Sequence, residues 1–232
     1  MTSENWAGYA STGNTGQFTS VSASWTQPTV TCTAQSTFSS FWVGLDGDGT
    51  NTVEQTGTEA DCDAGAATYQ GWFEMFPNAP VFYDNPVSPG DAMSASVVAN
   101  GGGQFTLTLT DATKGWTQAT NQTSATAQLG SAEVIAEAPS DGTVLPLSNF
   151  GTVSFSDVMA DNAPIGSENA SALTMVSAGG VTEATPSALS GGNAFSVTWD
   201  SSGTAAPSAT ATASAAGGGA PGTHHHHHWP GA

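Results

Sequence analysis

The sequence predicts an all-β fold, a sandwich or a barrel, with no significant helix. Apolar and polar residues alternate with a period of two in many segments, and Gly, Pro, Asn, Asp and Ser clusters interrupt them about every 8 to 12 residues. Segment 104–110 is the clearest case, because Phe105, Leu107 and Leu109 point one way and the threonines between them point the other. A half-buried strand requires this pattern.

The other predicted strands repeat the same signal along the chain. Each is a short run rich in aromatic and β-branched residues that ends at turn-forming residues, such as the glycines at 101–103 and 191–192. In chain order the predicted strands are 18–26, 39–46, 52–57, 67–76, 91–98, 104–110, 132–138, 151–156, 172–176 and 194–199.

The length of 232 residues suits one domain, which we place at residues 4–199. Residues 200–223 form a Ser-, Ala-, Thr- and Gly-rich segment without large apolar side chains, so a flexible tail is expected there. Residues 224–232 begin with a run of histidines that reads as an affinity tag. The chain starts without the basic and apolar parts of a signal peptide and has no long apolar run, so a mature form is expected.

The charge balance excludes several classes of partner. Asp and Glu number 19 against one basic side chain, Lys114, which gives a formal net charge of −18. Nucleic acids and anionic membranes both bind through Lys and Arg, so neither is an expected partner. We expect a monomer that needs no cofactor.

The absence of histidine before residue 224 excludes many catalytic arrangements. It leaves no Ser-His-Asp triad, no Cys-His pair and no histidine-based zinc motif, and no metal site is predicted. Lys114 lies in a predicted hairpin turn, where a solvated lysine is expected. Carboxyl groups remain for acid-base chemistry.

Two cysteines, Cys32 and Cys62, lie in polar, turn-rich sequence. They form either a disulfide or two free buried thiols, and the composition favours the disulfide. A disulfide indicates an exported protein, so we expect the protein to be secreted.

Several carboxylates share predicted strand faces with tryptophans. Trp42 and Asp46 have equal parity, as do Trp72 and Glu74, and so do Glu133 and Glu137. Taken singly, each carboxylate is explained by a solvated outer face. Taken together they indicate a cleft for a polymer, because aromatic walls bind extended chains and partly apolar clefts raise carboxyl pKa values.

An ordered series of motifs resembles the glutamic peptidases called eqolisins. The motifs are Asn5-Trp-Ala-Gly8, Phe18-Thr-Ser-Val-Ser22, Trp25-Thr-Gln-Pro28, Trp42-Val-Gly-Leu-Asp-Gly47, Glu54-Gln-Thr-Gly57, Gly71-Trp-Phe-Glu74 and Ala132-Glu-Val-Ile-Ala-Glu137. The resemblance runs from about Asn5 to Phe155. It implies a β-sandwich of two curved antiparallel sheets, of jelly-roll or concanavalin-like type, and an acid-active endopeptidase with a Gln and Glu dyad on the concave face.

The resemblance also implies the site residues. The catalytic pair is Gln55 and Glu137, with Glu133 as the rival for the glutamate. The matching motifs place Trp6, Trp42, Asp46, Trp72 and Glu74 along the substrate cleft, with Glu133 beside them. The chain departs from the fungal pattern at Glu54 and Val134 and in its cysteines, and is similar to a bacterial relative.

A water-activating mechanism follows from these residue types. Glu137 would take a proton from water and return it to the leaving nitrogen, and the Gln55 amide would stabilise the oxyanion of a peptide substrate. Two alternatives stay open: a jelly-roll glycosidase that uses Glu74 with Glu137, and a non-catalytic carbohydrate-binding or adhesion sandwich. The sequence contains neither Asp-Thr-Gly nor Asp-Ser-Gly, so no motif supplies the two aspartates of an aspartic protease.

Overall fold

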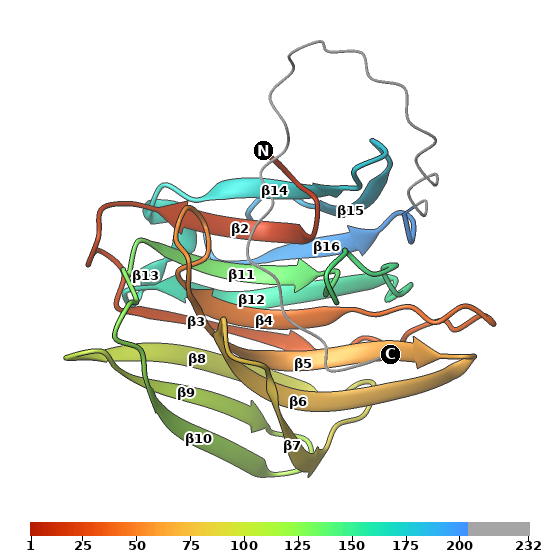
Figure 1. Ribbon diagram of the computed structural model, residues 1–232, viewed down its shortest axis with the longest axis horizontal. Coiled ribbons are helices and arrows are strands. Elements are labelled where there is room, and N and C mark those ends of the chain that lie inside the picture. Colours follow the sequence, from red (N-terminus) through yellow and green to blue (C-terminus); the bar gives the residue numbers. More distant parts are fainter. Residues whose placement is uncertain (204–232) are drawn as a thin grey trace.

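The computed structural model describes residues 1–203 as an almost entirely antiparallel β structure (Figure 1). The strands are β1 (Thr2–Ser3), β2 (Trp6–Thr12), β3 (Ser20–Thr26), β4 (Ser40–Leu45), β5 (Val53–Asp63), β6 (Ala66–Phe76), β7 (Val81–Pro86), β8 (Ala92–Gly101), β9 (Gln104–Asp111), β10 (Trp116–Thr123), β11 (Ser131–Glu137), β12 (Thr152–Ala160), β13 (Ala163–Pro164), β14 (Ser171–Val176), β15 (Thr182–Pro186) and β16 (Phe195–Trp199). One 3₁₀ turn, η1 (Ile165–Ser167), follows β13. This architecture confirms the predicted all-β sandwich.

The strands form two layers that are joined through β14. Hydrogen bonding follows the order β10-β9-β8-β3-β12-β16-β15-β14-β2-β11-β4-β5-β6-β7. One end of β14 pairs with β2 and the other end with β15, so the chain of strands passes there from one layer to the other. We call β2, β11, β4, β5, β6 and β7 the first layer, and β15, β16, β12, β3, β8, β9 and β10 the second layer (Figure 1).

The main core lies between the two layers. Its members include Phe18, Phe41, Val43, Leu45, Phe73, Met75, Met93, Phe105, Leu107, Leu109, Val134, Phe150 and Phe155. Phe105, Leu107 and Leu109 point inward from β9 as their alternation predicts, and each is at most 2% exposed. Burial of such side chains stabilises the fold by about 1.5 to 3 kcal/mol each.

The predicted strands all appear, and four further strands of at least five residues were not predicted, for identifiable reasons. Strand β2 is buried on both faces, so its residues do not alternate in polarity. Strand β10 is an edge strand whose residues are mostly polar. Strands β7 and β15 are short and each ends in a proline. Strand β5 runs to Asp63, well beyond the predicted end at residue 57.

The cysteines form the predicted disulfide. Cys32 and Cys62 are bonded and join the segment after β3 to the end of β5. Among residues 1–203, no helix is long and apolar enough to cross a membrane.

Most of the predicted tail, and all of the tag-like run, lie outside the described residues. Of the tail, residues 200–203 are described. The backbone N–H groups of Asp200 and Ser201 donate to the Glu183 carbonyl at 2.8 and 3.2 Å.

Candidate active site

A second apolar cluster covers the face of the first layer that points away from the main core. This aromatic face consists of Trp6, Ala10, Trp42, Val53, Trp72, Ile135 and Leu173. Its tryptophans come from three different strands, and the Trp6 and Trp42 rings meet edge to face at 5.0 Å between centroids. Strand alternation places the predicted site residues of β4, β5, β6 and β11 on this same side.

The register arranges these side chains in cross-strand rows. One row contains Ile135, Trp42, Gly57 and Trp72. The next row contains Glu133, Gly44, Gln55 and Glu74. The structure therefore brings Trp42, Trp72, Gln55, Glu74 and Glu133 onto one face of the first layer.

Glu74 holds the amide of Gln55. Gln55 Nε2 donates a hydrogen bond of 2.6 Å to Glu74 Oε2 from the neighbouring strand. An amide nitrogen carries two hydrogens, so one stays available for a second acceptor. The bond thus fixes the orientation of the Gln55 side chain without using its full donor capacity.

Two N–H donors hold the carboxyl group of Glu137. The Trp42 indole Nε1 donates to Oε2 at 2.7 Å, and Asn5 Nδ2 donates to Oε1 at 3.3 Å. Asn5 is oriented in turn by Ser3, whose hydroxyl donates to Asn5 Oδ1 at 3.2 Å. Since both carboxyl oxygens accept from N–H groups, this environment suits the ionised form of Glu137.

Asn5 was not among the predicted site residues. Its side chain reaches Glu137 because β2 pairs with β11, with Trp6 opposite Glu137. The sequence signal that could have identified Asn5 was its place in the motif Asn5-Trp-Ala-Gly8.

Gly44 makes room for the Trp42 ring, and Gly57 makes room for the backbone beside it. A Cβ on Gly44 would lie 2.7 Å from Trp42 Cζ3, and one on Gly57 would lie 2.1 Å from the Phe41 carbonyl oxygen. The six-membered ring therefore lies over Gly44, and the indole N–H on the other side of the ring points to Glu137. A side chain at residue 44 would displace the ring and redirect its N–H.

The register separates Gln55 from Glu137 by two strands and four residues. Gln55 is in the row of Gly44 and Glu133, whereas Glu137 is paired with Ser40. On a flat sheet this offset puts the two Cα atoms about 16 Å apart, from about 10 Å across the strands and about 13 Å along them. Because side chains on one face stand roughly perpendicular to the sheet, the twist and curvature of the sheet set how closely the two functional groups approach.

Glu133 lies closer to Gln55 by backbone register, but its surroundings differ. It is fully buried, and neither carboxyl oxygen has a hydrogen-bond partner among the described residues. Burial above all raises the pKa of Glu133 well above its usual range; the nearby carboxyls of Asp48, Asp46 and Glu54 raise it further, while Ser131 lowers it. These effects favour the protonated form of Glu133.

Asp46 ends β4 in a left-handed conformation, with φ of 67°. Its Oδ2 accepts the backbone N–H groups of Gln128 and Leu129 at 2.8 Å each, and its Oδ1 accepts that of Gly130 at 2.9 Å. These bonds anchor the segment that leads into β11. Asp46, which the resemblance places along the cleft, thus positions the strand that carries Glu133 and Glu137.

Glu54 points away from Gln55, as strand parity predicts. It pairs with Leu45 and Met75, which both belong to the main core. Burial, followed by the neighbouring Asp46 carboxylate, raises the pKa of Glu54 to about 8. Glu54 is therefore a neutral acid inside the sandwich when the surrounding solution is acidic.

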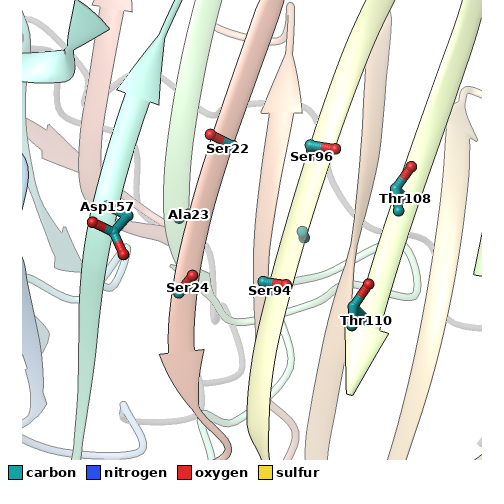
Figure 2. A pocket seen from close by; sticks show the side chains of 9 residues that line it. Ser22, Ala23, Ser24, Ser94, Ser96, Thr108, Thr110 and Asp157 are labelled. Carbon is teal, nitrogen blue, oxygen red and sulfur yellow. The ribbon is translucent and has the colours of Figure 1, made fainter. Parts of the chain in front are cut away.

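A separate hollow of about 230 Å³ lies on the outer face of the second layer. Figure 2 shows the hydroxyls of Ser22, Ser24, Ser94, Ser96, Thr108 and Thr110 across it, with Asp157 at one side. It has no aromatic wall. The aromatic face of the first layer is therefore the better candidate for an active site.

Comparisons with known proteins identify the family. The model of the peptidase A4 family matches residues 4–199. Aspergillopepsin-2 from Aspergillus niger is 26% identical over 150 residues; the alignment covers 61% of this chain and 53% of that protein, so this chain spans about half the length of the curated relative it matches.

Two solved structures share the fold. Scytalido-glutamic peptidase, in complex with a transition state analog inhibitor, superimposes with a TM-score of 0.74 at 23% identity, over 86% of this chain and 100% of that chain. SCP-B, a member of the eqolisin family in complex with the tripeptide Ala-Ile-His, superimposes with a TM-score of 0.68 at 22% identity, with the same coverage. These likenesses show the shared fold, and the match over residues 4–199 shows that the chain belongs to the peptidase A4 family.

Proposed function

We propose that this protein is an endopeptidase that hydrolyses protein and peptide substrates in acid with Gln55 and Glu137. The observation that carries the proposal is that both side chains lie on the aromatic face and are each held by a neighbour, Gln55 by Glu74 and Glu137 by Trp42 and Asn5. Membership of the peptidase A4 family supports the same reaction.

The chemistry follows from these contacts. A water between the two side chains would lose a proton to the Glu137 carboxylate as it attacks the peptide carbonyl carbon. The free N–H of the Gln55 amide would donate to the oxyanion that forms on the carbonyl oxygen. Glu137 would then give the proton to the leaving nitrogen as the C–N bond breaks, which returns the carboxylate to its starting state.

The tryptophans would support the substrate site from below. Trp6, Trp42 and Trp72 cluster on the aromatic face with buried side chains, so they would hold the catalytic side chains in place beneath a bound peptide. Glu133, protonated in acid, lies in the row of Gln55 and would donate a hydrogen bond rather than accept a proton. We extend the proposal to a secreted, monomeric enzyme, for which the disulfide and the acidic composition are the supporting observations.

Single substitutions of the two glutamates test the assignment. We expect Glu137→Gln to lower kcat on a fluorogenic peptide at pH 4 by at least about 10³-fold, since a general base contributes about 10² to 10⁴. We expect Glu133→Gln, the matched control, to keep kcat within about 10-fold, because a carboxamide can replace a neutral acid. Far-UV circular dichroism would verify that both variants fold.

A third variant tests the oxyanion donor. We expect Gln55→Ala to lower kcat by about 10² to 10³-fold, the usual cost of one such donor. Full activity in Glu137→Gln, or loss of activity in Glu133→Gln alone, would assign the role of general base to Glu133. Reducing sugar released from xylan or glucan, with no peptide cleaved, would instead support the glycosidase that uses Glu74 with Glu137.

A further inference from the structure

A cavity of about 510 Å³ lies beside the aromatic face and is not part of the site described above. Its volume is in the range of small-ligand sites, about 300 to 1,000 Å³. One wall is apolar and comes from Val144, Leu145, Pro146 and Ala178, while Glu4 and Glu183 supply carboxyl groups.

The cavity is joined to the surroundings of Glu137 through two stretches of chain. Glu4 lines the cavity and immediately precedes Asn5, whose amide donates to Glu137. The backbone N–H of Ala138, the residue after Glu137, donates to the Asn5 carbonyl at 2.9 Å. The segment that continues from Ala138 leads to the apolar wall at 144–146, so both stretches run from the cavity to Glu137.

Glu183 gives the cavity a buried polar group. Its side chain is only 3% exposed, and Oε2 has no hydrogen-bond partner among the described residues. No lysine, arginine or histidine is among the lining residues, and Asp200, whose backbone N–H bonds to Glu183, uses its carboxylate on the Thr185 hydroxyl. Burial raises the pKa of Glu183 to about 7, so in acid the group is a neutral hydrogen-bond donor.

We propose that this cavity is a substrate subsite that takes an uncharged side chain, aliphatic or carboxamide, of a peptide whose scissile bond lies at Gln55 and Glu137. The apolar wall and the carboxyls of Glu4 and Glu183 disfavour an acidic side chain, since it would be buried without a cationic partner. The protonated Glu183 carboxyl, which lines the cavity, can bond a carboxamide. The inference rests on the proposed peptidase function and adds a specificity determinant to it.

Peptides of two lengths test the subsite. Fluorogenic peptides would carry the same central residues, either alone or extended by five residues at one end or at the other, with Leu, Gln or Asp at each position of the extension in turn. We expect extension at one end to raise kcat/KM at pH 4 by at least 10-fold for Leu and Gln, and by less than 3-fold for Asp. No preference at any extended position would overturn the proposal.

Two variants assign that preference to the cavity. Ala178→Trp fills the cavity from an exposed turn, and we expect it to remove the gain from the extended peptides. Glu183→Leu should keep the gain for Leu and lose it for Gln. Ala119→Trp, which adds the same bulk to the outer face of β10, is the control and should leave the gain unchanged. An unaltered gain in Ala178→Trp would place the preference elsewhere.

A binding assay separates this inference from the proposed function. Fluorescence anisotropy of labelled peptides mixed with the Glu137→Gln variant, which should not cleave them, measures affinity without turnover. Tighter binding of the extended Leu peptide, lost on addition of Ala178→Trp, would support the subsite even if wild-type protein cleaved no peptide. Cleavage by wild type with equal affinity for short and extended peptides would uphold the peptidase and refute the subsite.

Discussion

Replacement of Glu54 by glutamine should remove much of the pH dependence of stability. Burial raises the pKa of Glu54 from 4.5 to about 8, so the unfolded chain releases this proton at a lower pH than the folded protein does. Between these two values the unfolded state binds fewer protons, and the free energy of unfolding falls as pH rises. The contribution is fully present below about pH 4.5 and is lost as pH rises through about 8.

The magnitude follows from the width of this window. At 1.36 kcal/mol for each pH unit, the rise from 4.5 to 7 lowers the stability of the wild-type protein by about 3 kcal/mol through Glu54 alone. Gln is nearly isosteric with the neutral acid and has no proton to lose. We therefore expect Glu54→Gln to resemble wild type at pH 4 and to be about 3 kcal/mol more stable than wild type at pH 7.

Urea unfolding at the two pH values measures this difference. Glu168→Gln removes the same formal charge from a partly exposed site and is the matched control, with an expected change within about 0.5 kcal/mol. Glu133, Glu59 and Glu183 also have raised pKa values because of burial, so wild type itself should have a lower Tm at pH 7 than at pH 4. Equal losses in Glu54→Gln and wild type between pH 4 and pH 7 would refute the reasoning.

Three further substitutions test contacts at and around the site. Trp42→Phe removes the indole donor to Glu137 and should lower kcat/KM, measured by steady-state kinetics, by about 10- to 100-fold. This is the usual contribution of a hydrogen bond to a charged group. A change below about 3-fold would contradict this role. Asp46→Ala leaves three backbone N–H groups without their acceptor and should destabilise the fold by about 3 kcal/mol in urea unfolding, whereas a loss under 1 kcal/mol would speak against the anchor. Replacing Cys32 and Cys62 by serine opens a loop with a sequence separation of 30 and should cost about 3 to 4 kcal/mol, which denaturant midpoints of the oxidised wild type and the variant would check.

Much of the fold could be predicted from local sequence. A period of two in hydrophobicity is set by which side of a strand is buried, so segment 104–110 was assigned correctly with its inward-facing Phe105, Leu107 and Leu109. The same logic fails for β2, whose two faces are both buried, and it says nothing about strand order. Strand β11 pairs with both β2 and β4, which lie far from it in the chain. These pairings form only when the whole sandwich folds, so local sequence does not predict them.

Local sequence was sufficient to predict the all-β class, the disulfide between Cys32 and Cys62, and the sharing of one sheet face by Glu133 and Glu137. Only the tertiary structure distinguished the two glutamates, because their environments come from other strands. Both glutamates are buried, but Glu137 receives donors from Trp42, 95 residues away, and Asn5, 132 residues away. Glu133 instead lies near other carboxyl groups. Side-chain parity is a local property of a strand, but hydrogen-bond partners and desolvation depend on which strands become neighbours.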